Sequence, residues 1–122
     1  IMPENEIDDL LELILQCIQL IQERFIKIKE PDDFVVSPEG VTMLDAITMR
    51  LQVIGESVKK IQKTNPSILL NYSEIEWDKI SRLRDLVSHH YEEVDNEIIF
   101  DICEKHIPQL EVTIRKIVNQ RC

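Results

Sequence analysis

Apolar residues recur every seven positions near the start of the chain, in two neighbouring rows: Ile7, Ile14, Ile21 and Ile28, with Leu11, Ile18 and Phe25. A sustained seven-residue repeat is typical of a helix that packs along its whole length against near-parallel neighbours. The pattern therefore predicts a first helix from about Glu4 to about Lys29, which Pro31 ends.

A second stripe follows at the three-four spacing of an amphipathic helix: Leu44, Ile47, Leu51, Ile54, Val58 and Ile61. Ser37 supplies an N-cap and Pro38 a first-turn proline, so we expect this helix to begin there and to reach about Lys63. Gly55 lies inside the stripe, where a glycine costs roughly 1 kcal/mol relative to alanine. We therefore expect Gly55 to let another helix approach closely.

The remainder of the chain predicts two further helices. Ser73 and Glu76 have the spacing of a capping box, which predicts a third helix from there through about Tyr91. Asn96 can cap a fourth helix that reaches the C-terminus, and Pro108 should kink or divide that helix. Four main helices without a predicted strand indicate an all-α, up-down helical bundle.

Composition agrees with one helical domain over residues 1–122. Hydrophobic residues make up 43% of the chain, which suffices for one core, whereas two glycines and 5% aromatic residues disfavour an all-β fold. The 14 basic and 23 acidic residues leave a net charge of −9, which disfavours non-specific binding to duplex DNA. A nucleic-acid role therefore needs a local basic patch.

The cysteines and the first apolar run bear on the cellular compartment. The three cysteines are widely spaced and include no C-x-x-C pair: Cys17, Cys103 and Cys122. This pattern disfavours a disulfide framework and a zinc site, and it fits a reducing cytoplasm. Glu12 and Gln16 interrupt the first apolar run, which also lacks positive flanks, so we expect neither a signal peptide nor a membrane span.

A basic residue interrupts an apolar stripe of the predicted third helix, which consists of Trp77, Ile80, Arg84, Val87 and Tyr91. Arg84 on such a stripe needs a partner or a wet cleft, or else it snorkels along the edge of the bundle. His89 lies five residues later, about 140° around the helix axis from Arg84. Asp85, one turn before His89, has the spacing to hold the imidazole in one tautomer, although a lone histidine is more often a solvated or satisfied surface residue.

The segment from Arg84 to Tyr91 reads R-D-L-V-S-H-H-Y and has the form R-x4-H-x-Y. It resembles the signature of the HepT-like toxins, members of the wider HEPN class of nucleotide-binding proteins. Flanking elements agree in order: Ile-Gly-Glu-Ser at 54–57, Trp77 before the motif, and Pro-x-Leu at 108–110. Asp85 departs from the family, which most often has Asn there, and a carboxylate at this position partly neutralises the neighbouring guanidinium.

The resemblance implies a metal-independent endoribonuclease without a cofactor, the toxin of a type II/VII-like toxin–antitoxin pair. The 2′-OH of RNA would attack the adjacent phosphodiester, with His89 transferring the proton and Arg84 stabilising the charge on the phosphorane. A symmetric homodimer would bring two motifs together at one cleft, which compensates for the angular separation of Arg84 and His89 within one helix.

The resemblance also implies a role for Tyr91. Proteins of this kind are encoded beside a minimal nucleotidyltransferase antitoxin, which transfers AMP to the tyrosine of the motif. An adenylylated Tyr91 would place bulk and phosphate charge in the cleft and so silence it. The alternative is that Tyr91 is an amphipathic residue at the edge of the bundle.

Two groups of basic residues are candidates for weak RNA contacts, although each can also be an ordinary solvated helix face: Lys79 and Arg82, and Lys59, Lys60 and Lys63. A di-metal carboxylate bundle requires Glu-x-x-His pairs, which the sequence lacks, so we expect no metal site. The remaining alternative is a non-catalytic nucleotide-binding or adaptor subunit of a nucleotidyltransferase. In that case Arg84 and His89 would bind without cleaving.

Overall fold

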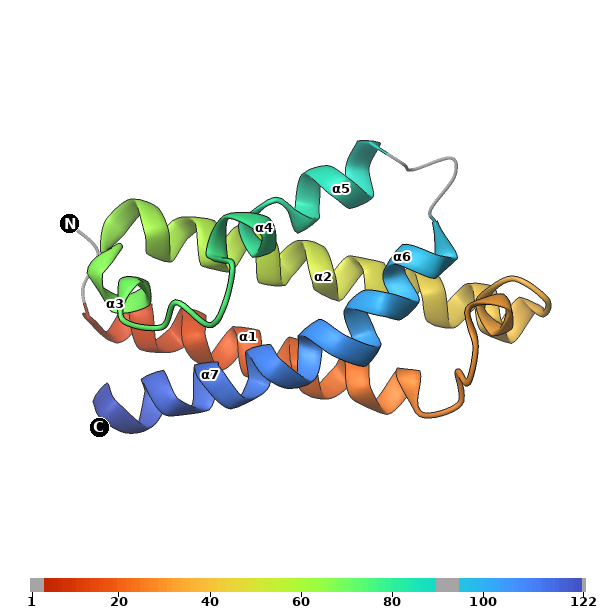
Figure 1. Cartoon of the computed structure of the whole chain (residues 1–122), viewed down its shortest axis with the longest axis horizontal. Helices are drawn as coiled ribbons and strands as arrows, with labels where there is room; N and C mark the ends of the chain where they lie inside the picture. The colour runs from red at the N-terminus through yellow and green to blue at the C-terminus, as the bar shows by residue number, and fades with distance from the viewer. Residues whose placement is uncertain (1–3, 90–94, 122) are drawn as a thin grey trace.

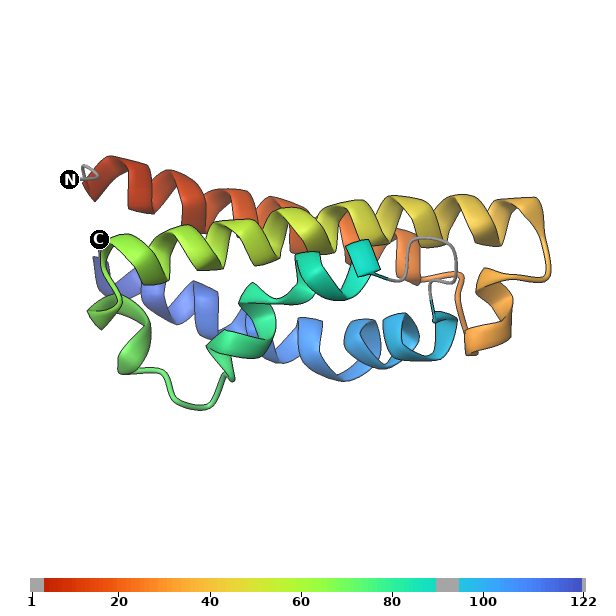
Figure 2. The same cartoon turned by 90° about the horizontal axis from the view of Figure 1, so that it is seen from above.

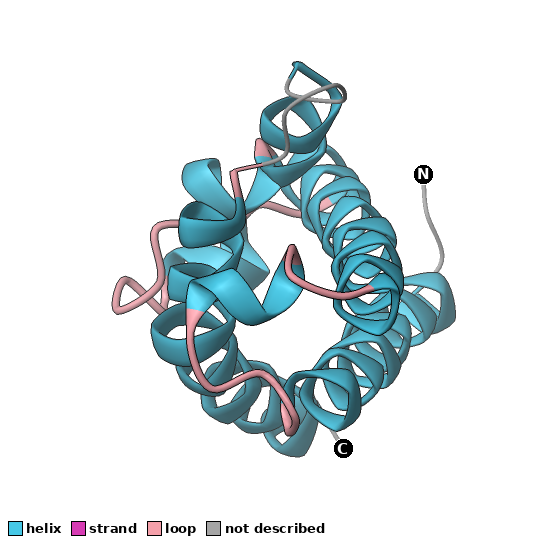
Figure 3. Cartoon of the chain, turned by 90° about the vertical axis from the view of Figure 1, so that its right-hand side faces the viewer, coloured by secondary structure: helices cyan, strands magenta, loops and turns pink. Residues whose placement is uncertain are grey.

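The computed structural model describes residues 4–89 and 95–121, and these residues form an all-α, up-down arrangement. Helix α1 (Glu4–Phe25) and helix α2 (Pro38–Thr64) run antiparallel and side by side over the length of the molecule (Figures 1 and 2). The last helix, α7 (Ile107–Arg121), lies along α1, and the shorter middle helices pack on α2. Seen along the bundle in Figure 3, the helices surround a common centre, which holds the apolar core.

The core confirms the two predicted stripes. All four isoleucines of the seven-residue repeat are buried, and so are all six apolar residues of the stripe in α2. The N-cap of α2 is also as expected, since the Ser37 hydroxyl accepts a hydrogen bond from the Gly40 amide at 3.0 Å. Helix α1 ends at Phe25, however, several residues before the predicted position near Lys29.

A side chain after α1 accounts for its early end. The Asp33 carboxylate accepts hydrogen bonds from the backbone amides of Lys29 and Glu30, at 2.7 and 3.1 Å. These bonds replace helical ones and lead the chain into a short 3-10 helix, η1 (Pro31–Phe34). Ile28 nevertheless stays buried, so the hydrophobic repeat continues beyond the helix that it predicts.

The third predicted helix is interrupted. After the short α3 (Ser67–Leu70), two separate segments follow, α4 (Trp77–Ser81) and α5 (Leu83–His89). The predicted capping box of Ser73 and Glu76 is wrong, because α4 begins at Trp77 and Glu76 caps it without a side-chain hydrogen bond. The segment before α4 is instead tied to the last helix: the Gln109 side chain donates to the Glu74 carbonyl, and the Thr113 hydroxyl donates to the Glu74 carboxylate.

The last predicted helix is present but irregular. It consists of α6 (Asn96–Asp101), a π-helical segment η2 (Ile102–His106) and α7 (Ile107–Arg121), and its direction changes along this path (Figure 1). Pro108 lacks an amide hydrogen and its ring crowds the carbonyl four residues earlier, which lies in η2, so the irregularity falls one turn before the proline. The N-cap is Asp95, not Asn96; the Asn96 side chain donates to the Pro31 carbonyl instead.

Candidate functional site

The break between α4 and α5 lies directly on Gly55 of α2. A Cβ atom at this position would lie 3.1 Å from both the backbone nitrogen of Arg84 and the carbonyl oxygen of Ile80. The predicted close approach is therefore confirmed, and the approaching element is the backbone of the α4–α5 junction. Within that junction, the Ser81 hydroxyl donates to the Asp78 carbonyl at 2.9 Å, which competes with the helical hydrogen bonds.

This break places Arg84 differently from the sequence prediction. Trp77 and Val87 are buried, but they belong to separate helices, so the predicted continuous stripe from Trp77 onwards is wrong. Arg84 is in the first turn of α5 with 61% of its side chain exposed. Its Nε lies 3.2 Å from Oε1 of Glu56, which is half exposed and directly follows Gly55 in α2. The predicted need for a partner is met by Glu56, a residue to which the sequence assigned no role.

The other residues of the motif are described less fully. Asp85 follows Arg84 in the first turn of α5, where a carboxylate interacts favourably with the positive end of the helix dipole. His89 is the last residue of α5; its side chain lies outside the described part, and so do His90 and Tyr91. The predicted contact between Asp85 and His89 therefore stays a prediction. Because Arg84 and His89 share a helix, their Cα atoms are about 140° apart around its axis.

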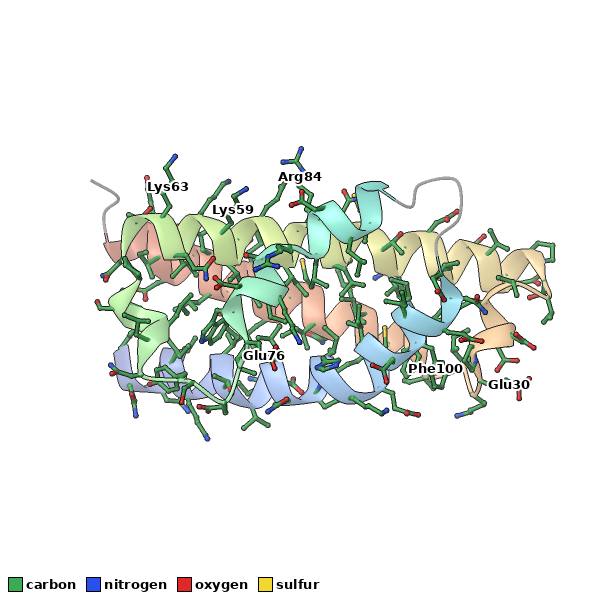
Figure 4. All side chains as sticks on the ribbon, turned by 45° about the horizontal axis from the view of Figure 1, so that its top comes forward. Glu30, Lys59, Lys63, Glu76, Arg84 and Phe100 are labelled. Atoms are coloured by element: carbon green, nitrogen blue, oxygen red, sulfur yellow. The ribbon has the colours of Figure 1, made fainter. Side chains whose placement is uncertain are left out.

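The five candidate RNA-binding residues fall into two groups in space. Lys59 and Lys63 of α2 project from the same edge of the molecule as Arg84 (Figure 4). Lys60, on the same helical turn as Lys59, is also exposed. Lys79 is instead engaged with Glu76, at 2.7 Å between Nζ and Oε2, and this contact lowers the pKa of the Glu76 carboxyl. Glu76 lies away from the edge that carries Arg84 (Figure 4).

Lys79 and Arg82 line a pocket of about 380 Å³ between the α4–α5 junction and the η2–α7 segment. Its apolar lining consists of Ile75, Ile80, Leu83, Leu86 and Ile102. Glu74, Glu76, His106 and Gln109 supply further polar groups. Arg84 is not among the lining residues, so the pocket and the Arg84 edge are separate features of the α4–α5 junction.

Two other kinds of chemistry find no support among the described residues. Among the side chains that the structure describes, which do not include that of His89, no three of His, Cys, Asp or Glu gather so as to hold a metal ion. Cys17 and Cys103 are buried, and burial raises the pKa of the Cys103 thiol to about 12, which keeps it protonated and poorly nucleophilic. Within the same described part of the chain, no helix is long and apolar enough to cross a membrane.

Similar proteins carry ribonuclease names. One from Methanocaldococcus jannaschii, named as a gamma-glutamylcyclotransferase and candidate RNase, is 32% identical over 88% of this chain and 45% of its own length. The chain thus spans less than half of that relative. A candidate RNase from Caldanaerobacter subterraneus subsp. tengcongensis is 33% identical, over 90% of this chain and 92% of the relative. A probable ribonuclease HepT from Thermococcus cleftensis is 30% identical, over 89% and 93%.

No solved structure shows significant similarity to the chain. The family described as "Ribonuclease HepT-like" matches residues 12–117. This range includes α2 with Gly55 and Glu56, the α4–α5 junction with Arg84, and the whole Arg-x4-His-x-Tyr segment. The chain therefore belongs to the HepT-like ribonuclease family.

Proposed function

We propose that this protein is a metal-independent endoribonuclease that uses Arg84 and His89 at a homodimer cleft. Membership of the HepT-like family supports ribonuclease activity. The observation that carries the proposal for this chain is the exposed guanidinium of Arg84, which projects from a backbone position fixed against Gly55. An exposed guanidinium on a rigid support is suited to bind the oxygens of a phosphodiester through paired hydrogen bonds.

The chemistry requires only groups that the motif provides. The 2′-oxygen of the substrate attacks the adjacent phosphorus and loses its proton, and the bond from phosphorus to the 5′-oxygen breaks as that oxygen gains a proton. The products are a 2′,3′-cyclic phosphate and a 5′-hydroxyl. His89 transfers protons, because an imidazole ordinarily titrates near neutral pH, and Arg84 stabilises the charge of the phosphorane.

The decisive experiment measures cleavage of a labelled RNA in the presence of a chelator. We expect His89→Ala and Arg84→Ala to lower the cleavage rate about 10²-fold or more. Equal cleavage by wild type and His89→Ala would contradict the proposal. RNA or nucleotide binding without cleavage by the wild type would instead favour the adaptor role.

The basic residues on the Arg84 edge are proposed as the path of the RNA backbone. Lys59, Lys60 and Lys63 follow one another along α2, and none of them forms an ion pair with any other described residue. Replacing Lys63 by alanine should reduce the slope of log RNA affinity against log salt concentration by about one, which corresponds to one released counterion. Lys79→Ala serves as the comparison and should have a smaller effect, since Glu76 already neutralises Lys79.

We further propose that the protein is the toxin of a toxin–antitoxin pair and that a minimal nucleotidyltransferase silences it by transferring AMP to Tyr91. An adenylyl group brings a negative phosphate, which would compete with RNA for Arg84. Co-expression with a cognate minimal nucleotidyltransferase should add adenylyl units to the intact mass, and Tyr91→Phe should abolish the gain. Expression of the wild type alone should arrest growth. Normal growth would argue against the toxin role.

A further inference from the structure

The ion pair between Glu56 and Arg84 lies where a negative charge is unfavourable for RNA binding. Glu56, Lys59, Lys60 and Lys63 lie at positions i, i+3, i+4 and i+7 of α2 and therefore share one helix face. Three of these four side chains are cationic, and Figure 4 shows two of them on the Arg84 edge. The carboxylate of Glu56 is the exception, and it contacts the guanidinium that would bind the phosphodiester.

Stability does not explain why a carboxylate is placed there. The side chains of Arg84 and Glu56 are 61% and 46% exposed, and exposed ion pairs contribute little to folding. The surroundings are nevertheless closely packed, because the backbone at Arg84 approaches Gly55 closely enough to bring the next residue of α2 beside it. The ion pair therefore has a defined geometry but contributes little to the free energy of folding.

We propose that Glu56 is a positioning residue, which holds Arg84 by the Nε side of the guanidinium and so directs the outer pair of nitrogens towards the phosphodiester. The proposal rests on the nuclease function proposed above. A free arginine side chain has many rotamers, and ordering it during the reaction costs entropy. Because the ion pair already orders Arg84 in the free enzyme, this entropy is not lost during the reaction, and kcat is higher. The same carboxylate repels the phosphodiester, which raises KM.

Removing the Glu56 carboxylate should lower both kcat and KM, each for a different reason. In Glu56→Ala, kcat should fall about tenfold because Arg84 loses its orientation. KM for RNA should fall about threefold because a negative charge leaves the binding edge. In Glu56→Gln, which keeps the shape and an acceptor oxygen, KM should fall similarly while kcat recovers part of its loss. Glu12→Ala, an exposed glutamate inside α1, is the control and should change neither constant.

A measurement that does not depend on catalysis tests the same claim. Nitrogen relaxation of the arginine Nε–H groups compares Arg84 with Arg82, which is also exposed and forms no ion pair with a described residue. In the wild type, Arg84 should be the more rigid of the two, and in Glu56→Ala it should become as mobile as Arg82.

Each outcome decides the proposal. It is overturned if Arg84 is as mobile as Arg82 in the wild type, or if Glu56→Ala keeps the wild-type kcat. It is also overturned if kcat falls without a fall in KM, since a general loss of folded protein gives that pattern. If the wild type cleaves no RNA, the proposed function fails, and the relaxation data alone then decide whether Glu56 positions Arg84.

Discussion

Replacing Gly55 by alanine tests whether the close packing of the α4–α5 junction on α2 is needed for Arg84. The added Cβ would lie 3.1 Å from two backbone atoms, the Arg84 nitrogen and the Ile80 carbonyl oxygen, and 3.4 Å from the Leu83 Cβ. The first two separations are shorter than ordinary van der Waals contact, and neither atom can rotate away because both belong to the backbone. The junction must therefore shift away from α2 by a few tenths of an ångström.

Two opposing terms set the expected change in stability. Alanine in place of a mid-helix glycine stabilises the helix by about 1 kcal/mol. Overpacking against backbone costs about 1–3 kcal/mol. The net change is a loss of about 0–2 kcal/mol in the free energy of unfolding. Because small domains are stable by about 5–15 kcal/mol, the variant should remain folded at room temperature.

The expected change in activity is larger than the change in folding. A shifted junction displaces Arg84 relative to Glu56 and to the substrate, and misplacement of a catalytic group by a fraction of an ångström costs about tenfold in rate. Urea unfolding and a chelator-containing RNA cleavage assay measure the two quantities on the same preparation. Gly40→Ala is the comparison: its Cβ would clash with the Asp33 carbonyl oxygen, so it should lose stability without a specific effect on Arg84. A Gly55→Ala protein that gains about 1 kcal/mol and keeps the wild-type cleavage rate would refute the reasoning.

Three further substitutions or treatments test the fold around the site. Asp33→Ala removes the acceptor of two backbone amides after α1 and should lower the free energy of unfolding by about 1 kcal/mol in urea titrations, whereas Asp33→Asn should lose less. Leu51→Ala empties a fully buried position and should cost about 2–5 kcal/mol by the same measurement; a cost below 1 kcal/mol would contradict the packing described for the core. Burial raises the pKa of the Cys103 thiol to about 12 and also raises that of Cys17, so iodoacetamide at pH 8 should label neither in the native protein within the time that labels both in urea.

The long helices could be predicted from sequence because their evidence is local and repeated. In α1 and α2 the apolar spacing recurs over many turns, and each repeat confirms the period set by the one before it. The Ser-Pro start of α2 adds a signal that depends only on adjacent residues. Periodicity does not fix a helix boundary where a single side chain decides it, as with Asp33, whose carboxylate accepts hydrogen bonds from amides that the helix would otherwise use.

The interruption between α4 and α5 depends on contacts that periodicity does not contain. Gln109 and Thr113 of α7 hold Glu74 from a distance in sequence, and this keeps the segment before Trp77 out of the predicted helix. The junction itself fits only because Gly55 offers no side chain. A stripe drawn through both helices therefore placed Arg84 among residues that suit a buried seam, where it needed a partner, a wet cleft or the edge of the bundle. In the structure Arg84 is exposed and has Glu56 as its partner. Two signals were available for Glu56: its position beside the glycine of the close approach, and its place in the Ile-Gly-Glu-Ser element.

Mixing two inactive variants tests whether each site is shared between subunits, because Arg84 and His89 of one chain lie on different sides of their helix. Their Cα atoms are about 140° apart around α5. If each site takes Arg84 from one subunit and His89 from the other, mixing inactive Arg84→Ala and His89→Ala chains should restore activity. Random exchange makes about half the dimers mixed, and each mixed dimer has one intact site of two, so recovery should reach about a quarter of the wild-type rate. If both residues of a site come from the same chain, neither chain in the mixed dimer has both groups. The mixture then stays inactive after the two chains are refolded together. That result would refute a site shared between subunits, but it would still allow a nuclease in which each site uses residues of one chain.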